Sequence, residues 1–95
     1  MVLHQVFNSP FNSAELQRFC EHAQEHDALL LLQDAVYALN HPLFSSLLTQ
    51  QKTIYILAND LLARGLVCHV TQVKVISDQQ WLALCVESSK VISWT

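Results

Sequence analysis

Two segments of the chain are apolar at nearly every position over the length of a strand. They read ALLLL at residues 28–32 and TIYIL at residues 53–57. A strand with one face in water alternates apolar and polar side chains, whereas an uninterrupted apolar run indicates a strand covered on both faces. Three further segments favour strands, namely 2–7, 74–76 and 90–94. These segments constrain the fold more than any other feature of the sequence.

Helical patterns lie between the expected strands. The clearest is an apolar stripe at i, i+3, i+4 and i+7 in the first helix, formed by Leu16, Phe19, Cys20 and Ala23. The other helical segments read AVYAL, PLFSSLLTQ, NDLLARG and DQQWLALCVES. Strands that alternate with helices predict a parallel sheet with helices on both faces. We therefore expect one α/β domain over residues 1–95, a three-layer sandwich around a mostly parallel sheet of about five strands.

Polar residues follow the expected strands and precede the helices. They are Asn8-Ser9, Gln33-Asp34, Asn59-Asp60 and Ser77-Asp78. Ligands bind at the carboxyl ends of parallel strands, so these residues are one candidate for a polar site. The interpretation that we favour for each residue is a helix N-cap. In the capping interpretation, the first helix starts at Asn12 with Glu15 three residues later, and the second helix starts at Asp34. The fourth helix starts at Asn59 or Asp60, and the last helix starts at Ser77 or Asp78. The second helix ends at His41-Pro42, and the fourth ends at Gly65.

Composition narrows the classes of function. Apolar residues make up 52% of the chain and charged residues only 14%, against about 25% charged in typical domains. So little charge predicts a surface that meets other proteins. The net charge is −3 and the five Lys and Arg residues are scattered, which argues against direct nucleic-acid binding. The longest apolar run is far shorter than the roughly 20 residues of a membrane span, and we expect a cytoplasmic chain.

Cofactor and metal chemistry finds little support in the sequence. One glycine, Gly65, cannot form the glycine-rich turn of a nucleotide site. His22 and His26 stand one helical turn apart and could share a metal ion, but Ala23 replaces the glutamate of zinc proteases and no third ligand is implied. We interpret both histidines as solvent-exposed and expect neither a metal nor a cofactor.

The three cysteines contain no C-x-x-C pair, which favours free thiols in a reducing compartment. Cys20 and Cys85 fall in apolar helical patterns and are expected to pack as small core residues. Cys68 precedes His69 in a loop or at the start of a strand. A neighbouring imidazolium would activate such a thiol, but adjacent residues of a strand point in opposite directions. Cys20 and Cys68 therefore remain candidates for reactive thiols, and no residue is assigned a catalytic role.

Five segments together resemble one protein family. They are LHQVFNSPF, LLLLQDAVYAL, YILANDLLARGL, VISDQQWLAL and the terminal SW. In this order and spacing they resemble the DsrH-like proteins, in particular the branch that serves tRNA 2-thiolation. The resemblance covers the whole chain and implies the DsrE/DsrH-like form of the α/β sandwich.

This resemblance implies a subunit of a sulfur relay. Related B-, C- and D-type chains would form a dimer of heterotrimers, which passes persulfide sulfur between small carrier proteins for 2-thiolation of the tRNA wobble uridine. The D-type relative carries its sulfur-accepting cysteine after the third strand, upstream of an Arg-Gly. Here that window reads LANDLLARG, with Arg64 and Gly65 present and no cysteine. Two hypotheses follow: a non-catalytic structural subunit, or a sulfurtransferase that uses Cys20 or Cys68. Some B-type relatives keep a cysteine in the first helix, near Cys20.

Overall fold

The structure, a computed structural model, describes residues 1–94. The elements in chain order are β1 Val2–Val6, α1 Glu15–His22, β2 Asp27–Leu31, the 3-10 helix η1 Gln33–Asn40, α2 Leu43–Thr49, β3 Thr53–Leu57, α3 Ala58–Ala63, β4 Val73–Ile76, α4 Asp78–Glu87 and β5 Lys90–Trp94. Among these residues no helix has the length and apolar character needed to span a membrane.

The five strands form one sheet in the order β4-β3-β2-β1-β5, and every neighbouring pair is parallel. The α/β fold class and the parallel sheet predicted from the sequence are confirmed. β2 lies at the centre, where it pairs with β1 through Leu29 opposite His4 and with β3 through Leu29 opposite Ile54. All strands end at the same edge of the sheet, so the residues that follow them gather there.

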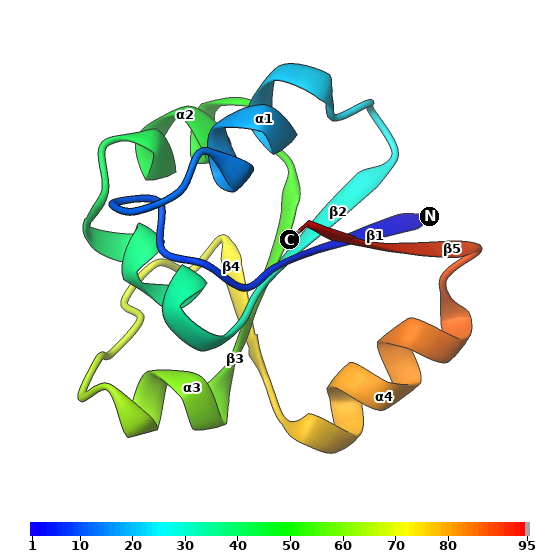
Figure 1. The fold of residues 1–95 in the computed structure, drawn as a ribbon. Coiled ribbons are helices and arrows are strands. Elements are labelled where there is room, and N and C mark those ends of the chain that lie inside the picture. The colour runs from blue at the N-terminus through cyan, green and yellow to red at the C-terminus, as the bar shows by residue number, and fades with distance from the viewer. Residues whose placement is uncertain (95) are drawn as a thin grey trace.

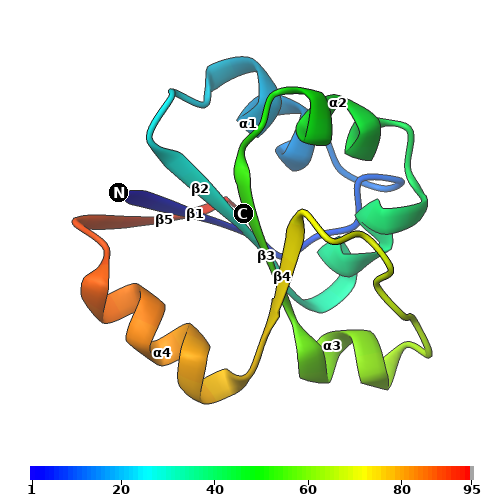
Figure 2. The ribbon, with the colours of Figure 1, turned by 180° about the vertical axis from the view of Figure 1, so that it is seen from behind.

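Helices cover the two faces of the sheet unequally (Figures 1 and 2). α1, η1, α2 and α3 contribute to the core on one face, whereas α4 alone contributes helical residues to the core on the other. Strand β2 supplies both cores, because Leu29 and Leu31 point to the first face and Leu30 to the second. Side chains alternate across a strand, which is why the ALLLL segment is apolar throughout.

Two helix boundaries confirm the sequence predictions. Gly65 follows α3 with φ of 66°, and the N–H groups of Gly65 and Leu66 donate to the Leu62 and Leu61 carbonyls at 3.2 and 3.0 Å. This is the Schellman arrangement, which requires a left-handed residue after the helix. Ser77 caps α4, with its hydroxyl accepting from the Gln80 N–H at 3.2 Å and the Gln80 side chain accepting from the Ser77 N–H at 2.8 Å.

The prediction for the start of α1 is wrong. The helix begins at Glu15 after Ala14, and its N-cap makes no side-chain hydrogen bond. Asn12 instead lies in a turn, where its N–H donates to the Ser9 carbonyl at 3.0 Å. The Glu15 carboxylate accepts from the Asn8 amide at 2.7 Å rather than closing a capping box. The contact of Glu15 with the end of β1 therefore replaces a local cap with a link between two elements.

A buried histidine connects the edge strand β5 to the rest of the sheet. The Trp94 indole donates to Nδ1 of His4 at 3.0 Å, and Nε2 of His4 lies 3.0 Å from Oδ2 of Asp27 on β2. Phe19 packs edge-on against the imidazole with ring centroids 5.0 Å apart. Because the indole N–H needs an acceptor, Nδ1 carries no proton and Nε2–H faces Asp27. The side chains thus join β5, β1 and β2 in addition to the backbone ladder.

Asp27 is expected to make the stability of the fold sensitive to acid. Burial acts to raise the pKa of its carboxyl, but the Gln24 N–H, His4 and Lys52 outweigh it and hold this pKa below the ordinary value of 3.8. A lowered folded-state pKa stabilises the fold above the ordinary pKa, and this contribution is lost as the pH falls through the lowered value. In urea unfolding between pH 5 and 2, Asp27→Asn should therefore lose stability less steeply than the native chain. Parallel acid profiles of the two proteins would contradict this assignment.

Candidate functional site at the carboxyl ends of the strands

The residues after β2 and β3 are joined by a network around Asp60. Its Oδ2 accepts from the backbone N–H of Gln33 at 2.7 Å. Arg64 lies one turn further along α3, with Nη1 at 3.6 Å from Oδ1 of Asp60 and Nε at 2.9 Å from Oδ1 of Asp34. Gln33 has a φ of 52°, a conformation that is unfavourable for a residue with a side chain. The carboxylate of Asp60 therefore stabilises a strained turn at the end of β2.

These contacts correct the predicted caps at this edge. The N-cap of α3 is Leu57 and that of η1 is Leu32, and neither makes a side-chain capping bond. Asp60 bonds to Gln33 and Asp34 to Arg64, so both carboxylates connect separate elements. Asn59 likewise reaches α4, where its amide donates to Oδ2 of Asp78 at 2.9 Å. The role of Arg64 was not predicted, although the spacing of Asp60 and Arg64 by four residues is a signal for an ion pair on a helix.

At the end of β1 the same edge holds a buried carboxylate. Glu15 is 6% exposed, and its Oε2 accepts from Asn8 while Oε1 has no partner among residues 1–94. Ser9 is also buried, and its hydroxyl accepts from the Phe11 N–H at 3.2 Å. The edge as a whole presents carboxylates, amides and one guanidinium, most of them engaged with each other. It is built to hold loops in place, and it offers no thiol.

Within residues 1–94 the three cysteines lie on separate elements, and none of their thiols is hydrogen-bonded to this network, although Cys68 shares a surface depression with Ala58 and Leu61 of α3. Cys20 is half-buried on α1 against the larger core. Burial raises the pKa of its thiol and is the largest effect. A backbone hydrogen bond acts to lower this pKa, and the charge of Glu21 acts to raise it. Cys85 on α4 faces the sheet, where it accepts from the Gln5 amide at 3.4 Å. Burial therefore disfavours the thiolate of Cys20, and the thiolate is the nucleophilic form of cysteine.

Cys68 lies in the loop between α3 and β4. It is half-buried, and its thiol lies 3.9 Å from the Val70 carbonyl. It lines a shallow apolar depression of about 290 Å³ with neighbours that include Leu62, Val67 and Val75. The adjacent His69 is exposed and makes no hydrogen bond with the thiol. Within residues 1–94 the candidate Cys68–His69 pair therefore does not form, as the opposite directions of adjacent side chains led us to expect.

The prediction that His22 and His26 stand one turn apart on the first helix is wrong, because α1 ends at His22 and His26 lies in the turn before β2. His22 and His26 are both exposed, and Nδ1 of His22 contacts the Arg18 carbonyl at 2.8 Å. Within residues 1–94 no group of three or more His, Cys, Asp and Glu side chains is placed to hold a metal ion.

Comparison with known proteins gives this arrangement a family context. The family model described as DsrH like protein matches residues 8–91. The chain belongs to the DsrH-like family. Two relatives named Protein TusB cover 98% of the chain over their full length: one from Pectobacterium parmentieri is 31% identical, and one from Sodalis glossinidius (strain morsitans) is 30% identical. The crystal structure of the ychN protein from E. coli shares the fold of this DsrH-like chain, with a TM-score of 0.72, 15% identity and 99% of both chains covered.

Within the DsrH-like family, the residues that follow β3 are of special interest. The resemblance implies that D-type relatives carry their sulfur-accepting cysteine at this point of the chain. This DsrH-like chain has Ala58, Asn59 and Asp60 at that point. Asn59 and Asp60 are already bonded to α4 and to the Gln33 turn. Two of these residues thus form structural cross-links at the point where the resemblance would place a reactive thiol.

Proposed function

We propose that residues 1–95 form a single DsrH-like domain that acts as a non-catalytic subunit of a cytoplasmic sulfur-relay complex. In this proposal the chain assembles with related C- and D-type subunits as a dimer of heterotrimers. The complex passes persulfide sulfur between small carrier proteins for 2-thiolation of the wobble uridine of tRNA. The chain itself positions the subunit that carries the thiol, and it contacts neither nucleic acid nor membrane.

The observation that carries this proposal is the engagement of Asn59 and Asp60 at the end of β3. In sulfur transfer an acceptor thiolate attacks the outer sulfur of a donor persulfide. A new S–S bond forms, the old S–S bond breaks and the donor leaves as a thiolate, without net oxidation. The acceptor must therefore be an accessible thiolate. At the end of β3 the chain offers a carboxylate and an amide instead, and both are bonded to neighbouring elements.

The alternative is an active sulfurtransferase that carries the persulfide on Cys20 or Cys68. In support of this alternative, neither residue is fully buried. Against it, burial raises the pKa of Cys20, and among residues 1–94 Cys68 has no imidazole partner.

Serine variants separate the two functions. We expect Cys20→Ser, Cys68→Ser and the double variant to retain 2-thiolated tRNA at the native level in cells, because no sulfur passes through this chain. The measurement is mass spectrometry of wobble nucleosides, together with trapping of persulfides on the purified complex. Cys85→Ser is the matched control, since Cys85 faces the sheet. Loss of thiolation in a variant that still assembles would establish the alternative.

A further inference from the structure

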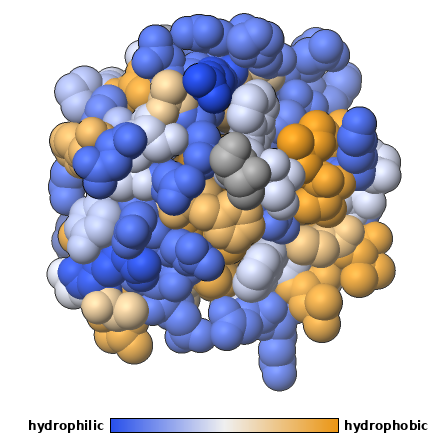
Figure 3. Space-filling view, viewed as in Figure 1, coloured by the Kyte–Doolittle hydropathy of each residue, from blue (hydrophilic) through white to orange (hydrophobic). Residues whose placement is uncertain are grey.

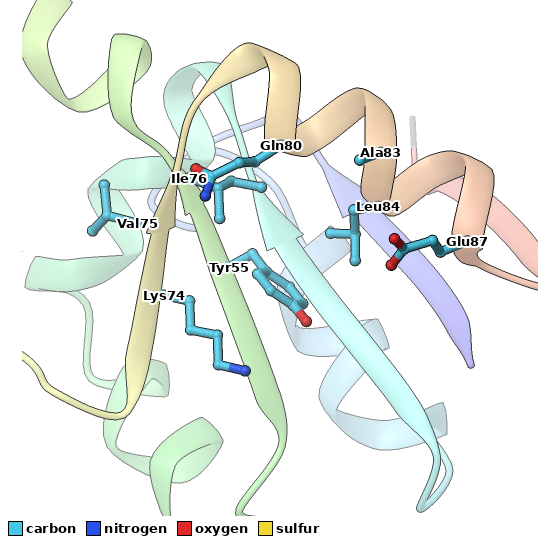
Figure 4. Close-up of a pocket in the computed structure, with 8 residues that line it drawn as sticks. All are labelled: Tyr55, Lys74, Val75, Ile76, Gln80, Ala83, Leu84 and Glu87. Carbon is cyan, nitrogen blue, oxygen red and sulfur yellow. The ribbon is translucent and has the colours of Figure 1, made fainter.

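The two edge strands of the sheet are held in different ways. β4 inserts Val73 and Ile76 into the cores on the two faces, and both are buried. Its Lys74 lines a groove of about 350 Å³ between α4 and strands β3 and β4, together with Tyr55 and with Glu87 of α4 (Figure 4). No residue of β5 is buried, and Figure 3 shows apolar side chains at the surface over β5 and α4, on the right of the view. Beyond its backbone pairing with β1, β5 therefore depends on few side-chain contacts.

The carboxyl end of β5 is fastened by the hydrogen bond of Trp94 to His4. The indole Nε1 donates to Nδ1 of His4 at 3.0 Å, and the two rings are stacked with centroids 6.1 Å apart. His4 is 6% exposed, so little water is available to replace the indole as its partner. The amino end is fastened separately, because the N–H and the hydroxyl of Ser89 donate to the Met1 carbonyl at 2.9 and 2.8 Å. The two ends of β5 are thus held by independent contacts.

The hydrogen bond from Trp94 requires a neutral His4. A neutral imidazole has one N–H and one acceptor nitrogen, whereas an imidazolium has two N–H groups and no acceptor. A proton on Nδ1 therefore places an N–H against the Trp94 N–H, and no rotation of the ring restores an acceptor. The contact of Nε2–H with the Asp27 carboxylate, at 3.0 Å, becomes stronger because the ring is then a cation. Protonation thus breaks the link to β5 and keeps the link to β2.

The charged groups around His4 come from three other strands and from α1. Asp27 of β2, Lys90 of β5 and His22 at the end of α1 line a pocket of about 290 Å³ with His4, and the charge of Lys52, just before β3, acts on Asp27. Histidine ordinarily changes its charge between pH 5 and 8, where lysine stays charged. Asp27 stays ionised there as well, because the pKa of its carboxyl is held below 3.8. Of these groups, His4 and His22 are the two that can respond in this range.

We propose that His4 is a pH switch for the edge strand β5: the neutral ring holds Trp94 and the protonated ring releases it, so that the carboxyl end of β5 opens while β1 and β2 stay joined. A proton binds the released form more tightly, because only the closed form must give up a hydrogen bond to accept it. Acid therefore shifts the equilibrium towards release. Release uncovers the edge of β1 beside Asn8 and Glu15, at the end of the sheet that carries the candidate site. The switch does not depend on a role in sulfur transfer.

Hydrogen exchange of the full chain, followed by NMR between pH 8 and pH 5, tests the switch. Protection factors are compared, since they divide out the pH dependence of the chemical exchange step. In the native chain the Trp94 indole N–H and the protected amides of residues 92–94 should lose about tenfold in protection, as expected when a hydrogen bond of the closed form is lost. The loss should follow the protonation of the His4 imidazole, read from its nitrogen shifts. Protection of the β4 amides should stay constant, because neither Lys74 nor Glu87 titrates in this range.

Three variants assign the response to this hydrogen bond. Trp94→Phe removes the donor and His4→Gln removes the titrating ring, so both should make the protection of β5 independent of pH. Trp94→Phe leaves the buried pair of His4 and Asp27 in place, and it covers the case in which His4→Gln does not fold. His22→Gln is the matched control, because it removes the other histidine of the pocket and should keep the native response.

Two results in the native chain overturn the proposal. One is unchanged protection of β5 at a pH where His4 is protonated, and the other is a His4 that remains neutral at pH 5. A response of native size in Trp94→Phe, or its loss in His22→Gln, would also overturn it.

Discussion

Replacing Phe19 by alanine is expected to lower the free energy of unfolding by about 3–5 kcal/mol. The phenyl ring is fully buried under α1 and packs edge-on against His4. α1 has eight residues, too few to be stable alone, so its position depends on such packing. Domains of this kind have only about 5–15 kcal/mol of stability in total. Urea unfolding followed by circular dichroism should therefore show a much earlier transition in the variant.

Cys20→Ala is the control for this substitution. Cys20 follows Phe19 on the same helix but is only half-buried. Truncation of its small side chain should therefore lower the free energy of unfolding by less than about 1.5 kcal/mol. If the two substitutions cost the same, α1 does not pack on the sheet through Phe19 as described.

Removal of the Asp60 carboxylate should cost about 2 kcal/mol, the usual loss for a hydrogen bond to a charged group. Asp60→Ala deprives the Gln33 N–H of its acceptor at a turn with positive φ. The ion pair with Arg64 adds little, because part of it faces water. The sulfur-transfer rate per assembled complex should stay unchanged, since no thiol intermediate passes through this residue. Chemical unfolding gives the stability, and single-turnover transfer on the purified complex gives the rate.

Asp60→Asn separates charge from geometry at this position. The amide keeps an oxygen that can accept from Gln33, so the variant should lose less than half as much stability as Asp60→Ala. A tenfold change in the transfer rate at equal assembly corresponds to about 1.4 kcal/mol in the barrier. Such a change would mean that this edge takes part in the chemistry, against the proposed structural role.

The strands could be predicted from the sequence because they are rich in apolar and β-branched residues, which the central strands need for burial and which suit an extended backbone. The segment TIYIL coincides with β3, and KVISW with β5. Gly65 and Ser77 were equally predictable, since the left-handed turn and the capping box each depend on residues within one helical turn. Local patterns of this kind specify local structure without knowledge of the rest of the fold.

The polar edge could not be predicted because its partners lie far apart in the sequence. Asp60 and Gln33 are 27 residues apart, and Arg64 and Asp34 are 30 apart. An aspartate before a helix satisfies the rules for an N-cap equally well. What decides between the two roles is the parallel pairing of β2 and β3, which brings the ends of the two strands together. The same reasoning applies to Glu15, whose carboxylate turns to Asn8 at the end of β1.

The position of β1 between β2 and β5 has a consequence for folding during synthesis on the ribosome. β1 is synthesised first, yet one of its two neighbours, β5, comprises residues 90–94. Until those residues emerge, the nascent chain presents β1 as an open edge, and such edges recruit other unfinished chains. Pairing of the first and last strands also closes a long loop, which slows folding. The nascent chain is therefore exposed to aggregation until β5 has emerged, and chaperones that shield a strand edge would act on it during translation.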